Sequence, residues 1–224
     1  MTGHVCQRIG HGGASALAPA NTLPSFDAAL EVGVDMVEFD VRYWRGELVL
    51  AHTILAARCP GSVRLHEALA HLAGGRFDGV GLNADVKQVG CERLLLDELR
   101  RYDLLGRALV SSQVPAVLDR LRELEPRART GISIGGKVAR LSHRCADRRW
   151  RDWRQQVLAG LDAGRWDVVM AQHRLIDVGL LDAVVSRGGL LYAWTVNERA
   201  CIQSLRGLGV HGIATADPRL FAPV

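Results

Sequence analysis

Short runs of apolar, mostly β-branched and aliphatic residues recur along the chain, and polar or glycine-rich positions separate them. Runs of this length and composition are typical of strands that are buried on both faces, as in a parallel sheet. The pattern predicts eight strands, at residues 5–11, 36–41, 80–86, 107–112, 130–135, 167–172, 190–196 and 211–216.

Segments with leucine and alanine at three- and four-residue spacing lie between most of these runs, which indicates helices with one buried face. They cover residues 22–33, 91–105, 114–126, 175–188 and 199–209. Several end at a glycine just before the next strand, the usual closure of a helix-to-strand loop.

Eight alternating strands and helices in 224 residues predict an α/β fold, a TIM (β/α)8 barrel, formed by a single domain over residues 1–224. A doubly wound open sheet is the alternative. It is less favoured because "GHGGAS", after the first strand, lacks the glycine spacing of a dinucleotide or phosphate-binding loop.

Charge and composition narrow the class of protein. The net charge of +4 is concentrated in residues 140–154, where six arginines face two aspartates, and this segment is predicted to be a solvated amphipathic helix. A basic surface of the kind that binds nucleic acid is not indicated elsewhere. The five cysteines are far apart, and neither a membrane-length apolar run nor a secretion signal is present, so a soluble cytoplasmic protein with reduced thiols is expected. The oligomeric state is not predicted.

Chemically active side chains stand at the ends of the predicted strands. His11 ends the first, Glu38 and Asp40 lie in the second, and Asp85 and Lys87 end the third. Trp194 and Asn197 lie at the end of the seventh, and His52 ends the run "ELVLAH". In a TIM barrel the loops after the strands build the active site, so these residues are expected on one rim.

Glu38 and Asp40 are two residues apart on a strand and therefore point to the same side, where two carboxylates repel each other unless a cation or proton intervenes. With Asp85 they would offer three oxygen ligands of the kind that Mg²⁺ or Ca²⁺ prefers, and Mn²⁺ is a further candidate. The alternative is that one of the pair faces solvent and pairs with Arg42 or Arg45.

Lys87 is one of only two lysines among 28 basic residues, and a compact ammonium beside Asp85 could contact a phosphate oxygen. His11 and His52 could act as general acid and base because imidazole titrates near neutrality. Lone histidines are more often structural. A serine-type triad is not indicated because the chain has no G-x-S-x-G turn.

The run "GHGGASALAPANTLPSFDAALEVGVDMVEFDVRYWRGELVLAH" resembles the signature of glycerophosphodiester phosphodiesterases, which reads His-Arg-Gly, Glu-Asn-Thr, Glu-x-Asp and His-Asp. "LNADVK" and "AWTVNERACIQSLRGLGVHGIATADPRLF" resemble later parts of that family, so the similarity extends from residue 8 to about 221.

The resemblance implies a TIM barrel and metal-dependent cleavage of glycerophosphodiesters to glycerol 3-phosphate and an alcohol. By position, the metal ligands would be Glu38, Asp40 and Asp85, the last in place of a more usual glutamate. The remaining roles would be an acid and base pair, a phosphate contact and a pocket wall, filled by His11 and His52, by Lys87, and by Trp194. Attack by water and attack by the glycerol 2-hydroxyl, which gives a cyclic phosphate first, both remain open.

Three motif residues are missing. Gly12 stands where the family has arginine, Ala20 where it has the glutamate of Glu-Asn-Thr, and Thr53 where it has the aspartate after the second histidine. Because a paired arginine and glutamate can be lost together without leaving an isolated charge, an active enzyme with a shifted substrate or lower rate is favoured. The alternative is a weak or inactive homologue that binds phosphodiesters or lipid headgroups.

Overall fold

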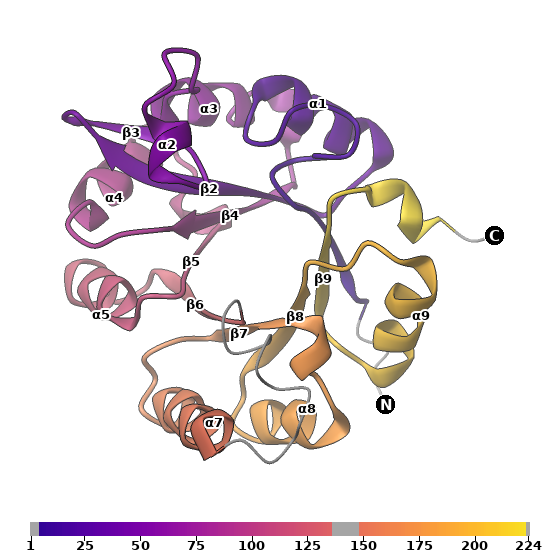
Figure 1. Cartoon of the computed structure of the whole chain (residues 1–224). Coiled ribbons are helices and arrows are strands. Elements are labelled where there is room, and N and C mark those ends of the chain that lie inside the picture. Colours follow the sequence, from indigo (N-terminus) through magenta and orange to yellow (C-terminus); the bar gives the residue numbers. More distant parts are fainter. Residues whose placement is uncertain (1–4, 136–147, 223–224) are drawn as a thin grey trace.

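The computed structural model describes residues 5–135 and 148–222, and its central feature is a closed barrel of eight parallel strands (Figure 1). β1 pairs with both β2 and β9, which closes the barrel. The eight strands are β1 (Gln7–Gly10), β2 (Met36–Trp44), β4 (Gly81–Val86), β5 (Ala108–Ser112), β6 (Arg129–Ile134), β7 (Val168–Gln172), β8 (Leu190–Trp194) and β9 (Gly212–Thr215). All eight predicted strands and the TIM barrel are confirmed.

Helices surround the barrel (Figure 1) and cover the outward side chains of its strands. They are α1 (Leu23–Val32), α3 (Leu65–Leu72), α4 (Glu92–Arg101), α5 (Pro115–Leu124), α7 (Arg148–Asp162), α8 (Val178–Val185) and α9 (Arg199–Leu208). The shorter helices are α2 (Ile54–Ala57), η1 (Gly75–Phe77), η2 (Leu105–Arg107), η3 (His173–Leu175) and η4 (Pro218–Phe221). The five predicted helices are confirmed, whereas α2 and α3 were not predicted.

The inside of the barrel changes character along its axis. Its lower part is apolar and consists of Ile9, Met36, Leu109, Val168, Met170, Tyr192 and Ala214. Because side chains alternate along a strand, the inward residue two positions further on lies in the next layer. On β2, β4, β5 and β6 that layer is polar, with Glu38, Asn83, Ser111 and Ser133. The polar half of the interior therefore lies toward the carboxyl ends of the strands.

A ninth strand, β3 (Glu47–Leu50), was not predicted and lies outside the barrel ring. It pairs antiparallel with the end of β2 across a two-residue turn, in which Arg45 and Gly46 have φ values of 49° and 91°. Two positive φ values identify a type I′ hairpin turn, for which Arg-Gly is a weak sequence signal. The hairpin returns the chain to the barrel mouth, where the amide of Ala51 donates to the carbonyl of Asp40 at 3.1 Å.

The arginine-rich segment 140–154 is only partly covered by the structure. Residues 140–147 lie outside the described residues, and residues 148–154 begin helix α7, in agreement with the predicted helix. Trp153 packs at the margin of the outer core. In the described part of the chain, no helix combines the length and the apolar character that a membrane crossing requires.

Candidate active site

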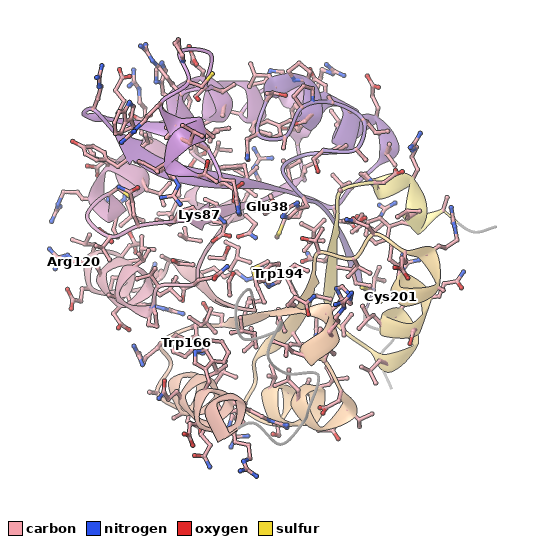
Figure 2. All side chains as sticks on the ribbon, viewed as in Figure 1. Glu38, Lys87, Arg120, Trp166, Trp194 and Cys201 are labelled. Atoms are coloured by element: carbon pink, nitrogen blue, oxygen red, sulfur yellow. The ribbon has the colours of Figure 1, made fainter. Side chains whose placement is uncertain are left out.

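The predicted site residues come together at the polar mouth of the barrel. One cavity there is lined by His11, Glu38, His52, Asn83, Asp85, Lys87, Ser111, Gln113, Ser133, Met170, Trp194 and Ala214. Figure 2 shows Glu38, Lys87 and Trp194 near the barrel axis, whereas Arg120 and Cys201 lie at the periphery. A larger cavity of about 370 Å³ lies outside the barrel beside the start of β1 and contains none of the predicted site residues.

Three carboxylates form the centre of the site. Glu38 and Asp40 share the inward face of β2, and Asp85 on β4 is the register partner of Asp40. One oxygen from each of the three lies within 4.8 Å of the others. Burial, followed by the nearby charge of Asp40, raises the pKa of Glu38, and burial likewise raises the pKa of Asp85. Two of the three carboxyl groups therefore bind protons more readily than usual, and a cation bound among them would favour their ionised forms.

Hard divalent cations fit this arrangement. Asp85 Oδ1 is buried and has no hydrogen-bond partner among the residues that the structure describes. A buried carboxylate oxygen without a partner is costly, and a metal ion would satisfy it. Three carboxylates are also the ligand type that Mg²⁺, Ca²⁺ and Mn²⁺ prefer.

Lys87 follows β4 directly, and its ammonium lies between two of the carboxylates. It is 2.5 Å from Asp40 Oδ1 and also contacts Asp85 Oδ2. Burial would lower its pKa, but the charges of Asp85, Asp40 and Glu38 outweigh burial and raise it. Lys87 therefore keeps its charge although its side chain is largely buried.

The two histidines occupy different environments. His11 follows β1, its amide donates to the carbonyl of Thr215 at 2.9 Å, and burial lowers its pKa. His52 follows β3, is more exposed, and its Nδ1 lies 3.2 Å from Asp40 Oδ1. That hydrogen bond raises the pKa of His52. Environments that shift two pKa values in opposite directions suit a pair in which one group accepts a proton and the other donates one.

Asn21 is a site residue that the sequence reasoning did not single out. Its side chain donates to Asp40 Oδ2 at 2.8 Å and accepts from the Asp40 amide at 2.9 Å. These two bonds hold the Asp40 carboxylate in place. Burial would raise the pKa of Asp40, but its contacts with His52, Lys87 and Asn21 outweigh burial and lower it. Asn21 has a φ of 62°, a conformation that asparagine tolerates better than most residues. Its place in the "ANT" motif was the available signal.

The positions of the missing motif arginine and glutamate are neighbours in space. A Cβ atom on Gly12 would lie 3.1 Å from the Cβ atom of Ala20. Gly12 has a φ of 60°, and its amide donates to Glu38 Oε2 at 2.7 Å. Because positions 12 and 20 are adjacent, the missing arginine and glutamate could have been lost as a pair. The positive φ means that any residue other than glycine at position 12 would strain the backbone.

Trp194 ends β8 and closes one side of the cavity. Its indole Nε1 donates to the carbonyl of Met170 at 2.8 Å, which fixes the ring. Asn197 accepts hydrogen bonds from Thr215 Oγ1 and the Ala216 amide. It therefore ties the loop after β8 to the end of β9. Asn83 Oδ1 and Ser111 Oγ are buried and have no hydrogen-bond partner among the described residues. Both residues line the cavity, so a bound molecule could form hydrogen bonds with these atoms.

The acidic, basic and imidazole groups gather at the carboxyl ends of the strands, which is where TIM-barrel enzymes have their active sites. A family model described as "Glycerophosphoryl diester phosphodiesterase family" matches residues 11–71 and 79–220. The chain belongs to this family, whose members are phosphoric diester hydrolases. The family resemblance of the sequence motifs is thereby confirmed.

Individual relatives carry names of the same kind of enzyme. The chain is 26% identical over 241 residues to YhdW of Bacillus subtilis (strain 168), a protein named provisionally as a glycerophosphodiester phosphodiesterase, with 94% of each chain covered. An Oleispira antarctica phosphodiesterase in complex with the product sn-glycerol-3-phosphate superposes with a TM-score of 0.76 at 21% identity, covering 95% of this chain and 94% of the other. A glycerophosphodiester phosphodiesterase from Thermotoga maritima gives a TM-score of 0.72 at 20% identity, covering 97% of both chains. These structures have the same fold as this chain.

Proposed function

We propose that this protein hydrolyses glycerophosphodiesters, or closely related phosphodiesters, to glycerol 3-phosphate and an alcohol. The observation that carries the proposal is one cavity in which two histidines, a lysine and two carboxylates of the three-carboxylate cluster meet. Membership of the family supports the reaction type, and the product named in the Oleispira antarctica complex supports the glycerol phosphate half of the substrate.

Glu38, Asp40 and Asp85 would hold the metal ion, with Mg²⁺, Ca²⁺ and Mn²⁺ as candidates. A divalent ion bound there would neutralise negative charge on the phosphoryl oxygens. Asn21 keeps Asp40 oriented for this task through its two hydrogen bonds. Lys87 adds a fixed positive charge to the lining of the cavity, where a phosphoryl oxygen would be attracted to it.

His11 and His52 would transfer the protons of the reaction. One histidine accepts the proton of the attacking hydroxyl or water, and the other donates a proton to the oxygen of the departing alcohol. Trp194, held by Met170, forms a wall that limits how the substrate can lie. The attacking group is water or the glycerol 2-hydroxyl, and detection of a cyclic glycerol phosphate early in the reaction would identify the second route.

The proposal is tested by incubating the protein with glycerophosphoglycerol or bis(p-nitrophenyl) phosphate and each candidate metal, and by measuring glycerol 3-phosphate or p-nitrophenol. Turnover that depends on added metal and stops with a chelator is expected. Arg120→Gln, which changes an exposed arginine paired with Glu123 at the periphery, is the control and should keep full activity. Binding of phosphodiesters without any turnover would instead identify a binding protein.

A further inference from the structure

Arg42 is a cation that reaches the active-site mouth and has no acidic partner among the described residues. It follows Glu38 and Asp40 at two-residue spacing on β2 and therefore lies on the same strand face. Its Nε and Nη2 donate to the carbonyl of His52 at 3.2 and 3.1 Å, and its Nη1 lies 3.4 Å from Gln88 Oε1. Among the described residues, no carboxylate lies within ion-pair distance of its guanidinium.

A side groove of about 270 Å³ opens beside this guanidinium. It is lined by Arg42, His52, Val86, Lys87, Gln113 and Val114. His52, Lys87 and Gln113 also line the central cavity, so the two spaces adjoin at the groups proposed to act on the phosphodiester. A substituent on the phosphate could therefore extend from the central cavity into the side groove.

The charges of the side groove favour one kind of substituent. The ammonium of Lys87 is already balanced by Asp40 and Asp85, whereas in the described chain the guanidinium of Arg42 contacts only neutral oxygens. No aspartate or glutamate lines the side groove in the part of the chain that the structure describes. A guanidinium without a carboxylate partner suits a carboxylate or phosphate oxygen, and the same charge repels a quaternary ammonium group.

We propose that the side groove binds the alcohol half of the substrate and that Arg42 selects alcohols that carry a carboxylate or phosphate. The proposal rests on the proposed function and narrows it from glycerophosphodiesters in general to those with an anionic alcohol. The reaction itself is unchanged, since the P–O bond to that alcohol breaks and the alcohol leaves with a proton. Substrates with a choline headgroup are expected to be poor.

Three diesters that differ only in the alcohol test the proposal: glycerophosphoglycerate, glycerophosphoglycerol and glycerophosphocholine. The native protein should show a kcat/KM for the glycerate diester at least about tenfold above that for the glycerol diester, the scale expected for one charge-assisted hydrogen bond. The choline diester should be the slowest. Arg42→Gln should abolish most of the preference for glycerate, and Arg42→Lys should retain part of it.

The ratio between substrates is the informative quantity. Loss of the contact between Arg42 and the His52 carbonyl would affect every diester alike, so it cancels in the ratio. Arg45→Gln is a matched control, because Arg45 stacks over Trp44 and does not line the side groove. It should leave the ratio within about twofold of the native value, the small effect usual for a surface charge. Equal kcat/KM values for all three diesters, or a preference that survives in Arg42→Gln, would overturn the proposal.

A binding measurement separates this proposal from the proposed function. Calorimetric titration with 3-phosphoglycerate and with glycerol 3-phosphate compares a carboxylate and a hydroxymethyl group on the same phosphate scaffold and requires no turnover. The native protein should bind 3-phosphoglycerate more tightly, and Arg42→Gln should bind the two equally. If no diester is hydrolysed but this difference appears, the proposed function fails and the anion site stands. Equal binding by the native protein refutes the anion site even if diesters are hydrolysed.

Discussion

Two clusters of cations and carboxylates in this protein look alike in composition but differ in completeness. Outside the start of β1, the guanidinium of Arg8 forms two hydrogen bonds with the Asp35 carboxylate, at 2.8 and 3.0 Å, and the Arg8 amide adds a third at 2.7 Å. At the opposite, polar end, one ammonium serves two carboxylates with a third close by.

The difference shows how a structural ion pair can be distinguished from a reactive site. Arg8 and Asp35 match one to one, and both side chains are more than a third exposed. The cluster of Glu38, Asp40 and Asp85 is almost fully buried, carries excess negative charge and includes an oxygen without a partner in the described chain. The first cluster is complete by itself, whereas the second leaves a buried carboxylate oxygen that a further cation would satisfy.

The largest effect is expected from removing a carboxylate of the buried cluster. Glu38→Gln and Asp85→Asn should weaken divalent metal binding in calorimetric titration and lower turnover by at least roughly a thousandfold, because a catalytic metal supplies several kcal/mol. In the absence of metal, Glu38→Gln should be as stable as the native protein or more stable in thermal unfolding, since it relieves repulsion. Unchanged metal affinity in both variants would show that the cluster is not a metal site.

The histidines should give the next largest effect. His11→Ala and His52→Ala are each expected to lower turnover by about a hundredfold or more while the unfolding temperature changes little, the usual scale for a positioned proton-transfer group. Steady-state kinetics on a diester with a poor leaving group provides the measurement. His66→Ala, at an exposed position of α3, is the matched control. A histidine variant that retains native turnover would have no role in proton transfer.

Restoring the missing motif residues should have a moderate effect. Gly12→Arg alone introduces a charge at a position with positive φ and should be neutral or harmful. Combined with Ala20→Glu, whose Cβ would be adjacent, it should raise kcat/KM on glycerophosphodiesters by more than the sum of the single changes in free energy. A double-mutant cycle at saturating metal measures the coupling. Strict additivity in a folded double variant would mean that the two losses are unrelated.

The smallest effect is expected from removing the ion pair of Arg8 and Asp35. Asp35→Asn should reduce the free energy of unfolding at neutral pH by about 1 kcal/mol or less, as is usual for a partly exposed ion pair. Burial opposes ionisation of Asp35, but hydrogen bonds from Arg8 outweigh it and lower its pKa in the folded state. The stabilisation is therefore present above the ordinary aspartate pKa and is lost as the pH falls through the lower, folded-state pKa. In chemical denaturation, the free energies of unfolding of the native protein and of Asp35→Asn should differ at pH 7 and move closer together near pH 3. Activity at neutral pH should be unaffected.

The sequence predicted the barrel because its strands are buried on both faces, which leaves short apolar runs such as residues 190–194. It also predicted the rim residues, because the end of a strand fixes where His11 or Asp85 can lie. The motif around Asn21 pointed to the site, but the contacts of Asn21 and Arg42 could not be predicted, since each depends on a partner brought close by a turn with positive φ. The position of Lys87 between two carboxylates likewise depends on the pairing of β2 with β4.

The hairpin of β2 and β3 has a consequence for protein engineering. Its turn at Arg45 and Gly46 begins five residues beyond Asp40, roughly 17 Å away at about 3.3 Å per residue, and projects from the ring of barrel strands. Since the antiparallel pairs between this turn and His52 fix the geometry of the site, peptides inserted at the turn should leave that geometry in place. The turn is thus a suitable position for a fluorescent label or an affinity tag, because either would stay outside the cavity of the candidate active site.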